Sequence, residues 1–296
     1  MRNIRVITDS ACDLSTELVK KYGITVIPLN IHIGDETFVD RSVKNSEFYK
    51  KMSLSKELPK TSHPSTETFL ENYEGDEDLI VITISSQLSS TYYTASLAQN
   101  MCEQNDKTRK IAVIDSEVGS IGQGQLAVIA AKLIEEDRSF EEIVDILEKI
   151  KKRIIFYGVL DNLDNAIKSE RISPLTGKIV GALNFNVIIN IGNNVVKPIG
   201  TAKGYDTALA SIQNLVFDRI GDVSKKSLFI GHANNLPKAI IMKNIMFGNS
   251  LMLLAIFLFM WCGFMKSMYV LMWIAIALIL IGFIIAVVGY ISKDKK

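Results

Sequence analysis

The sequence predicts an α/β protein with a parallel-sheet N-terminal domain, a smaller α+β second domain and then two transmembrane helices. Three observations support this fold class. Short runs rich in Val and Ile alternate with helical segments as far as about residue 153, a hairpin pattern follows, and the last fifth of the chain is nearly free of charge. The predicted domains are therefore residues 1–153, 154–243 and 244–292.

The N-terminal domain is defined by its apolar runs, at residues 4–8, 24–31, 79–84 and 111–114. Such nearly continuous runs are typical of strands covered on both faces, and hence of a parallel sheet. Between them lie helical segments with clear ends. One covers residues 15–22 and ends at Gly23, and another covers 139–152 and opens with the capping box Ser139/Glu142. The βαβα order predicts a doubly wound sheet.

The second domain begins where this alternation stops. A strand is expected from Ile154, and the runs 186–191 and 195–199, joined across an Asn/Gly-rich break, indicate a β-hairpin. A helix over 205–217 and a strand over 228–231 complete the predicted α+β domain.

The C-terminal segment has a different composition. Residues 244–265 and 267–292 are uninterrupted by charge, and each run exceeds the roughly 20 residues that cross a bilayer core. A buried core helix is the alternative, but such a helix usually keeps a polar stripe, which is missing from 251–261 and 270–288. Only Lys266 lies in the turn, whereas lysines flank both ends. The positive-inside rule therefore predicts a multi-pass protein of the cell membrane that binds membrane lipid, with its soluble domains in the cytoplasm.

Composition excludes several classes of function. Residues 1–243 carry 29 Lys and Arg against 31 Asp and Glu, a net −2 that gives no basic footprint for nucleic acid. The three cysteines, Cys12, Cys102 and Cys262, are scattered, which argues against a disulfide framework or a zinc site. No metal-binding or nucleotide-binding spacing is present, so no metal and no cofactor is expected. The N-terminus has no apolar signal core, so export of residues 1–243 is not expected.

Hydroxyl side chains follow the predicted strands. Thr8-Asp9-Ser10, the segment 85–91 and Asp115-Ser116 come after three of them, and the loop 61–65 precedes a helix. Ligands of open parallel sheets bind beyond the carboxyl ends of the strands, and hydroxyls beside a helix N-terminus suit a small anionic group such as a carboxylate. The alternative is that these Ser and Thr residues are ordinary caps and turn residues.

The same segments carry a family resemblance. The ordered set resembles the DegV family of bacterial fatty-acid-binding proteins, and it comprises VITDSACDLS (6–15), TSHPS (61–65), ITISSQLSSTY (82–92), VIDSEVGSIGQG (113–124), VLDNLDNAIKSERIS (159–173) and IGHANN (230–235). The resemblance implies a carrier without a reaction of its own. Such a carrier holds one long-chain fatty acid between its two domains and presents the carboxylate to a fatty-acid kinase.

The resemblance also implies the site residues. The family's T-S-Q-P-S motif falls on residues 61–65, so Thr61 and Ser62 are implied carboxylate ligands, with His63 in place of Gln. The S-S-x-L-S-G-T-Y motif falls on 85–92 and implies Ser86 and Ser89. Arg171 and Lys203 are possible second-domain contacts, and Lys203 stands where an Arg is usual.

Two departures leave alternatives open. The family's H-x-G-P-G segment, which closes the head-group site, is not found, so the second domain is expected to be truncated. The chain could therefore be a degenerate fusion of a DegV-like domain to unrelated membrane sequence. An acyl-processing enzyme with a serine nucleophile such as Ser89 is a further alternative, although no hydrolytic triad can be assembled.

Overall fold

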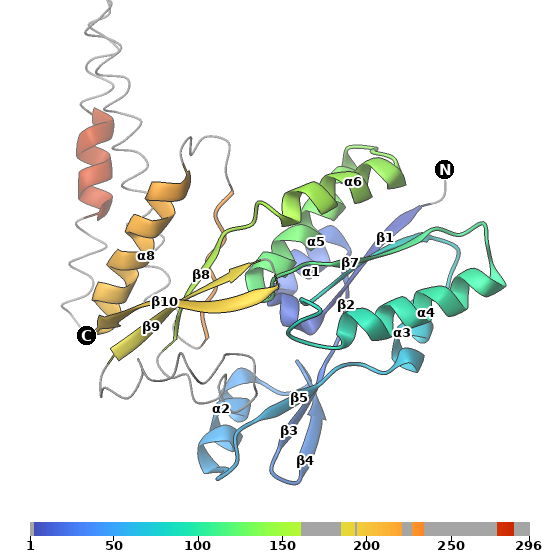
Figure 1. The fold of residues 1–296 in the computed structure, drawn as a ribbon, viewed down its shortest axis with the longest axis horizontal. Helices are drawn as coiled ribbons and strands as arrows, with labels where there is room; N and C mark the ends of the chain where they lie inside the picture. Colours follow the sequence, from blue (N-terminus) through green and yellow to red (C-terminus); the bar gives the residue numbers. More distant parts are fainter. Residues whose placement is uncertain (1–2, 161–184, 193, 221–226, 234–276, 287–296) are drawn as a thin grey trace, which may run out of the picture. The chain divides into compact units, whose positions relative to one another are not determined.

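The computed structural model describes residues 3–160, 185–192, 194–220, 227–233 and 277–286. The chain divides into two compact units, residues 1–208 and 209–296, which are described separately. The helices and strands up to residue 208 are, in chain order (Figure 1), β1 (Ile4–Asp9), the 3-10 turn η1 (Ser10–Cys12), α1 (Thr16–Tyr22), β2 (Thr25–Ile27), β3 (Asn30–Ile33), β4 (Glu36–Val39), α2 (Asn45–Leu54), β5 (Lys60–Ser62), α3 (Thr66–Asn72), β6 (Asp78–Thr83), α4 (Thr91–Asn105), β7 (Ile111–Asp115), α5 (Ser120–Glu135), α6 (Phe140–Lys151), β8 (Phe156–Leu160), β9 (Phe185–Gly192) and β10 (Val195–Lys203). The helix α8 (Tyr205–Ile220) begins in the first unit and continues into the second.

The central sheet has the strand order β2-β1-β6-β7, and every neighbouring pair is parallel. This confirms the parallel sheet predicted from the Val/Ile runs. Every residue of β6 is buried, which explains why its sequence, DLIVIT, shows no alternation of polar and apolar residues.

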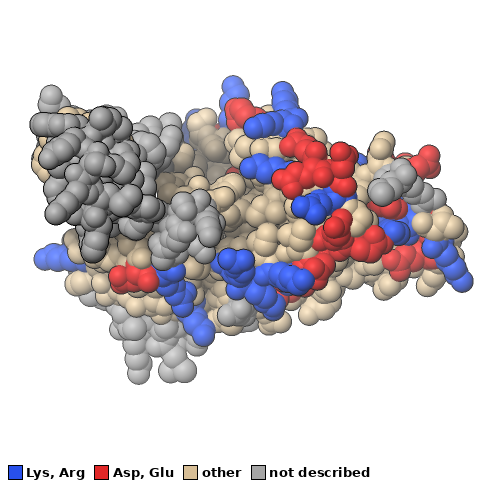
Figure 2. Space-filling view, turned by 90° about the horizontal axis from the view of Figure 1, so that it is seen from above, with Lys and Arg blue, Asp and Glu red and all other residues tan. Residues whose placement is uncertain are grey.

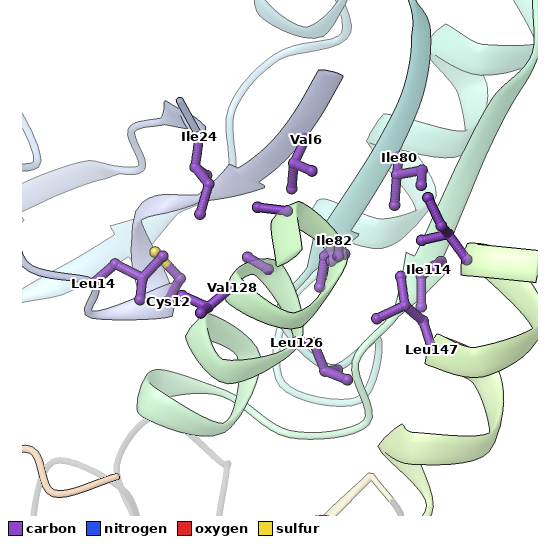
Figure 3. Close-up of a cluster of buried hydrophobic side chains, with 14 residues drawn as sticks. Val6, Cys12, Leu14, Ile24, Ile80, Ile82, Ile114, Leu126, Val128 and Leu147 are labelled. Carbon is purple, nitrogen blue, oxygen red and sulfur yellow. The ribbon is translucent and has the colours of Figure 1, made fainter. Parts of the chain in front are cut away.

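Helices cover both faces of this sheet, as a doubly wound fold requires. On one face, side chains of β1, β6 and β7 pack against α5 and α6 in a cluster that includes Val6, Ile82, Leu126 and Leu147 (Figure 3). On the other face, side chains of the same strands pack against α3 and α4 in a second cluster, which includes the fully buried Tyr73.

The helix ends agree with the sequence prediction. Ser15 caps α1 by accepting a hydrogen bond from the Leu18 amide, and the helix ends at Gly23 in the left-handed conformation, with φ +59°. Both hydrogen bonds of the Ser139/Glu142 capping box are present at the start of α6.

The strand predicted over residues 24–31 is two strands. Pro28 has no N–H with which to continue a ladder, and the chain leaves the parallel sheet at this residue. β3 then pairs antiparallel with β4 and with β5 in a separate three-stranded sheet. A single continuous strand was therefore the wrong prediction here.

A third sheet, of order β10-β9-β8, is antiparallel throughout. It contains the predicted hairpin, with Val196 opposite Ile191 and an irregularity between Pro198 and Gly200. The strand predicted over 228–231 is not formed, because residues 227–233 have no regular structure and Leu228 is 54% exposed. The domain boundaries at residues 153 and 243 stay predictions.

The predicted membrane localisation is contradicted. Among the residues that the structure describes, no helix is long and apolar enough to cross a membrane. Of the predicted transmembrane pair, 244–292, only residues 277–286 are described, as one helix, and the rest lies outside the described residues. The prediction of a multi-pass membrane protein is therefore corrected.

A close approach between α5 and η1 gives a test of this packing. A Cβ at Gly124 would lie 2.5 Å from the Cys12 carbonyl oxygen and 2.9 Å from Leu14 Cδ2. We expect Gly124→Ala to lower the free energy of unfolding by about 1–3 kcal/mol, since overpacking outweighs the better helix propensity of Ala. Urea unfolding followed by circular dichroism measures this. Gly200→Ala, where the nearest atom is Ile188 Cδ1 at 3.9 Å, is the control and should change stability little.

Candidate functional site

The strand order reverses between β1 and β6. The chain leaves β1 to form β2 on one side, and it leaves β6 to form β7 on the other. In open parallel sheets, ligands bind beyond the carboxyl ends of the strands at such a reversal. Here the two loops concerned are residues 9–12 and 84–90, which are among the hydroxyl-rich segments singled out in the sequence.

Asp9, the last residue of β1, links these two loops. Its Oδ2 accepts a hydrogen bond from the Ile84 amide at 2.8 Å, and its Oδ1 accepts one from the Ala11 amide at 3.0 Å. Asp9 is only 1% exposed, and this burial raises the pKa of its carboxyl to about 6, although the hydrogen bonds from Ile84, Gln123 and Ala11 act in the opposite direction. The charge at the sheet edge therefore changes between pH 5 and 7.

The loop after β6 is held by several contacts. The Ser85 amide donates to the Val118 carbonyl at 2.8 Å, and the Ser85 hydroxyl donates to Asn194 Oδ1 at 2.6 Å. The Ser86 amide donates to Asp115 Oδ1 at 3.1 Å. The backbone of this loop is thus fixed from β7 and from the β9–β10 turn.

Gln123 in α5 was missed as a site residue by the sequence analysis. Its Nε2 donates to Thr8 Oγ1 at 2.9 Å and to the Ile82 carbonyl at 3.3 Å, and the side chain is fully buried. Its Oε1 is buried without a hydrogen-bond partner in the described part of the chain. The signal that could have found it is a glutamine flanked by Gly122 and Gly124 in a segment otherwise rich in small and apolar residues.

Asn194, in the turn between β9 and β10, was also missed. It adopts a left-handed conformation with φ +63°, and its backbone N–H donates to the Glu117 carbonyl at 3.1 Å. Glu117 is 7% exposed, and its carboxylate lies 2.5 Å from Lys152 Nζ and 3.6 Å from Lys151 Nζ. The turn therefore contacts the loops that follow both β6 and β7.

Thr61 and Ser62 do not follow a strand of the parallel sheet. They belong to β5, where Thr61 is opposite Ile31 in the antiparallel sheet with β3. The loop 61–65 precedes the helix α3, as predicted, and the structure adds that its first two residues pair with β3 in the second sheet, into which the chain is diverted at Pro28. His63 nevertheless joins the loop 61–65 to α4, since its Nδ1 lies 3.2 Å from Thr94 Oγ1.

The predicted carboxylate ligands differ in what their hydroxyls already bind. Ser62 Oγ lies 3.0 Å from His32 Nε2, and Ser89 Oγ lies 2.8 Å from Thr91 Oγ1. No side-chain hydrogen bond is found for Thr61 or Ser86 within the described residues. No hydrogen bond described here joins Thr61 or Ser62 to Ser86 or Ser89, and the roles of all four stay predictions.

Of the two predicted second-domain contacts, Lys203 and Arg171, the structure describes only Lys203. Lys203 is the exposed last residue of β10, opposite Phe185. Arg171 lies outside the described residues.

Two further observations concern ligand chemistry. No group of three or more metal-ligating side chains is found in the described part of the chain.

A hollow of about 690 Å³ lies at the amino-terminal end of β7, lined by residues that include Lys107, Lys110, Phe140, Glu141 and Asp145. Its charges are of both signs, as on much of the described face in Figure 2, where acidic and basic side chains are interspersed. This hollow does not coincide with the hydroxyl loops.

Fold and site together define a class: a doubly wound α/β protein with a hydroxyl-lined loop at the switch point of its sheet, joined to an antiparallel sheet. The family model described as "Uncharacterised protein, DegV family" matches residues 3–245. The chain therefore belongs to the DegV family, as the sequence motifs indicated.

Individual relatives agree with this assignment. A DegV domain-containing protein of Caldanaerobacter subterraneus is 31% identical over 239 residues, covering 79% of this chain and 84% of that protein. A DegV-family crystal structure from Ruminococcus gnavus with vaccenic acid has a TM-score of 0.77 and 30% identity, covering 83% of this chain and 89% of that one. The fatty acid kinase (Fak) B3 protein of Streptococcus pneumoniae, loaded with linoleic acid, has a TM-score of 0.66 and 26% identity over 73% of this chain and 78% of that one.

These comparisons bear on two predictions. Two solved proteins of the family, from Thermus thermophilus and Bacillus subtilis, are described as binding fatty acids, which agrees with the predicted class of lipid-binding proteins. The family match extends to residue 245, and the comparisons give no support to a truncated second domain or to a transmembrane hairpin.

The raised pKa of Asp9 predicts a pH-dependent stability. A carboxyl whose pKa is about 6 in the folded protein and about 3.8 when unfolded stabilises the fold below pH 3.8, and this contribution is lost as the pH rises through 6. The variant Asp9→Asn has no carboxyl that titrates at this position, so it lacks this pH-dependent contribution to the free energy of unfolding. The free energy of unfolding of the wild type, minus that of the variant, should therefore fall by about 2 kcal/mol between pH 4 and pH 7.

Urea unfolding at several pH values measures this difference. Asp76→Asn removes one charge from an exposed loop and is the control for net charge. An equal pH dependence for the two variants would show that the Asp9 carboxyl is not the group responsible.

Proposed function

We propose that this protein binds one long-chain fatty acid, with the carboxylate on the hydroxyls of Thr61, Ser62, Ser86 and Ser89, and presents it to a fatty-acid kinase. Arg171 and Lys203 are proposed second-domain contacts, and no metal or cofactor takes part. The observation that carries the proposal is the Ser-rich loop at the switch point, whose backbone is fixed while the Ser86 hydroxyl has no described partner.

The chemistry of this loop suits a carboxylate. Hydroxyls donate hydrogen bonds to carboxylate oxygens, and α4, which begins at Thr91, adds the positive end of a 15-residue helix dipole. The Thr91 amide donates to Ser89 Oγ at 3.3 Å, but Ser90 makes no side-chain capping bond, which leaves the next amides of this first turn for an anion.

The relatives support the ligand class and the partner. Solved members of the family hold vaccenic, linoleic and heptadecanoic acids, and the Streptococcus pneumoniae relative is a fatty acid kinase (Fak) B3 protein. The serine-dependent acyl-processing enzyme is not favoured, because the described side-chain partner of Ser89 is the hydroxyl of Thr91 and not a base.

The ligand class is tested by native mass spectrometry of the purified full chain. We expect one long-chain fatty acid per chain. Addition of ATP and a bacterial fatty acid kinase should then yield an acyl phosphate from the bound lipid. Repeated recovery of a nucleotide or metal in place of lipid would contradict the proposal.

The head-group site is tested by removing hydroxyls. Thr61→Ala and Ser86→Ala should each weaken fatty-acid binding about 10-fold, because an unmet hydrogen bond to a buried charged group costs on the order of 1–3 kcal/mol. A fluorescent fatty-acid displacement assay measures this.

The matched control is Ser90→Ala. This residue lies in the same loop, is exposed, and makes no capping bond, so its removal should leave affinity unchanged. Equal affinities for all three variants and the wild type would place the carboxylate elsewhere.

A further inference from the structure

Asp115 accepts a hydrogen bond from the backbone amide of Ser86, the serine whose hydroxyl has no described partner. It is the last residue of β7, in register with Thr83 of β6, and its Oδ1 accepts hydrogen bonds from the Ser86 amide at 3.1 Å and the Glu117 amide at 3.0 Å. The sheet ladder stops at Thr83, so the Asp115 side chain continues the connection between β7 and the loop after β6. The orientation of Ser86 therefore depends on Asp115.

Only one of the two carboxylate oxygens of Asp115 accepts these hydrogen bonds. Both hydrogen bonds end on Oδ1, and no hydrogen bond to Oδ2 is found in the described part of the chain. Asp9, on the other side of the same loop, differs because it uses Oδ2 for the Ile84 amide and Oδ1 for the Ala11 amide. An asparagine can reproduce the contacts of Asp115, since its single carbonyl oxygen can accept both bonds, but it cannot reproduce those of Asp9.

The two hydrogen bonds that Asp115 accepts therefore do not need its negative charge. That charge nevertheless lies close to Ser86. Because the amide and the hydroxyl belong to one residue, the carboxylate oxygen that accepts from the Ser86 amide at 3.1 Å lies at most about 7 Å from the Ser86 hydroxyl. Lys152, a cation that interacts electrostatically with Asp115, is ion-paired with Glu117 at 2.5 Å. No ion pair of Asp115 is found among the described residues.

We propose that Asp115 is a positioning residue that fixes Ser86 through its Oδ1 while its charge weakens the binding of anionic ligands at the Ser86 hydroxyl. This inference rests on the proposed function, because it takes the ligand head group to be a carboxylate at Ser86. It separates two effects of one side chain: the hydrogen bonds raise the affinity for any ligand of this hydroxyl, and the charge lowers the affinity for anions alone.

The test compares Asp115→Asn with Asp115→Ala in the full chain, using two probes of equal chain length, a fatty acid and the corresponding fatty alcohol. Asp115→Asn should bind the fatty acid about threefold more tightly than the wild type, the size of a Coulomb interaction between unit charges about 6 Å apart in a water-like dielectric. Its affinity for the alcohol should be unchanged. Asp115→Ala removes both the acceptor and the charge. It should bind the alcohol about 10-fold more weakly, because the Ser86 amide loses its acceptor, and the fatty acid only about threefold more weakly, because the loss of the charge offsets part of that effect.

The matched control is Asp76→Asn, which removes the same charge from the exposed loop before β6, at the opposite end of that strand. It should change neither affinity. Weaker binding of the fatty acid by Asp115→Asn, or equal changes for acid and alcohol, would overturn the role of the charge. Wild-type protein that binds neither probe would overturn the proposed function itself, whereas wild-type binding with unaltered Asp115 variants would overturn this inference alone.

Discussion

The strand β6 is buried along its whole length, so the hydrogen-bonding groups available for recognition are gathered where it ends. Beyond Thr83 the ladder no longer satisfies the backbone, and a buried amide without an acceptor costs on the order of 1–3 kcal/mol. Two aspartates from the neighbouring strands supply the acceptors: Asp9 binds the Ile84 amide and Asp115 binds the Ser86 amide. The position of the serine loop follows from this constraint.

The sequence was sufficient for the parts of the fold that depend on local patterns. The Val/Ile runs predicted three strands of the parallel sheet, because strands buried on both faces need continuous apolar residues. The caps at Ser15 and Ser139 predicted helix starts, because they depend only on residues within one turn. The loops after β1, β6 and β7 were located correctly, since they follow directly from the strand ends.

Features that depend on distant residues were beyond the sequence. The run 24–31 was taken as one strand, and nothing local showed that the chain after Pro28 would join β4 and β5 in another sheet, which is why the pairing of Thr61 with β3 was not foreseen. Gln123 and Asn194 were missed because their partners, Thr8 and Ser85, are more than a hundred residues away. The apolar composition of 244–292 predicted a membrane location that no described helix supports.

Asn194 couples the β9–β10 hairpin to the loops that follow β6 and β7. One residue donates its amide to Glu117 and accepts the Ser85 hydroxyl, so the β9–β10 hairpin is tied to two loops at a single point. Displacement of the hairpin breaks both hydrogen bonds together, so each of the two loops loses one of its restraints at the same moment. Local unfolding of this kind is cooperative, so the rate of deuterium uptake at the Asn194 backbone amide reports on how often the hairpin also releases the Ser85 hydroxyl.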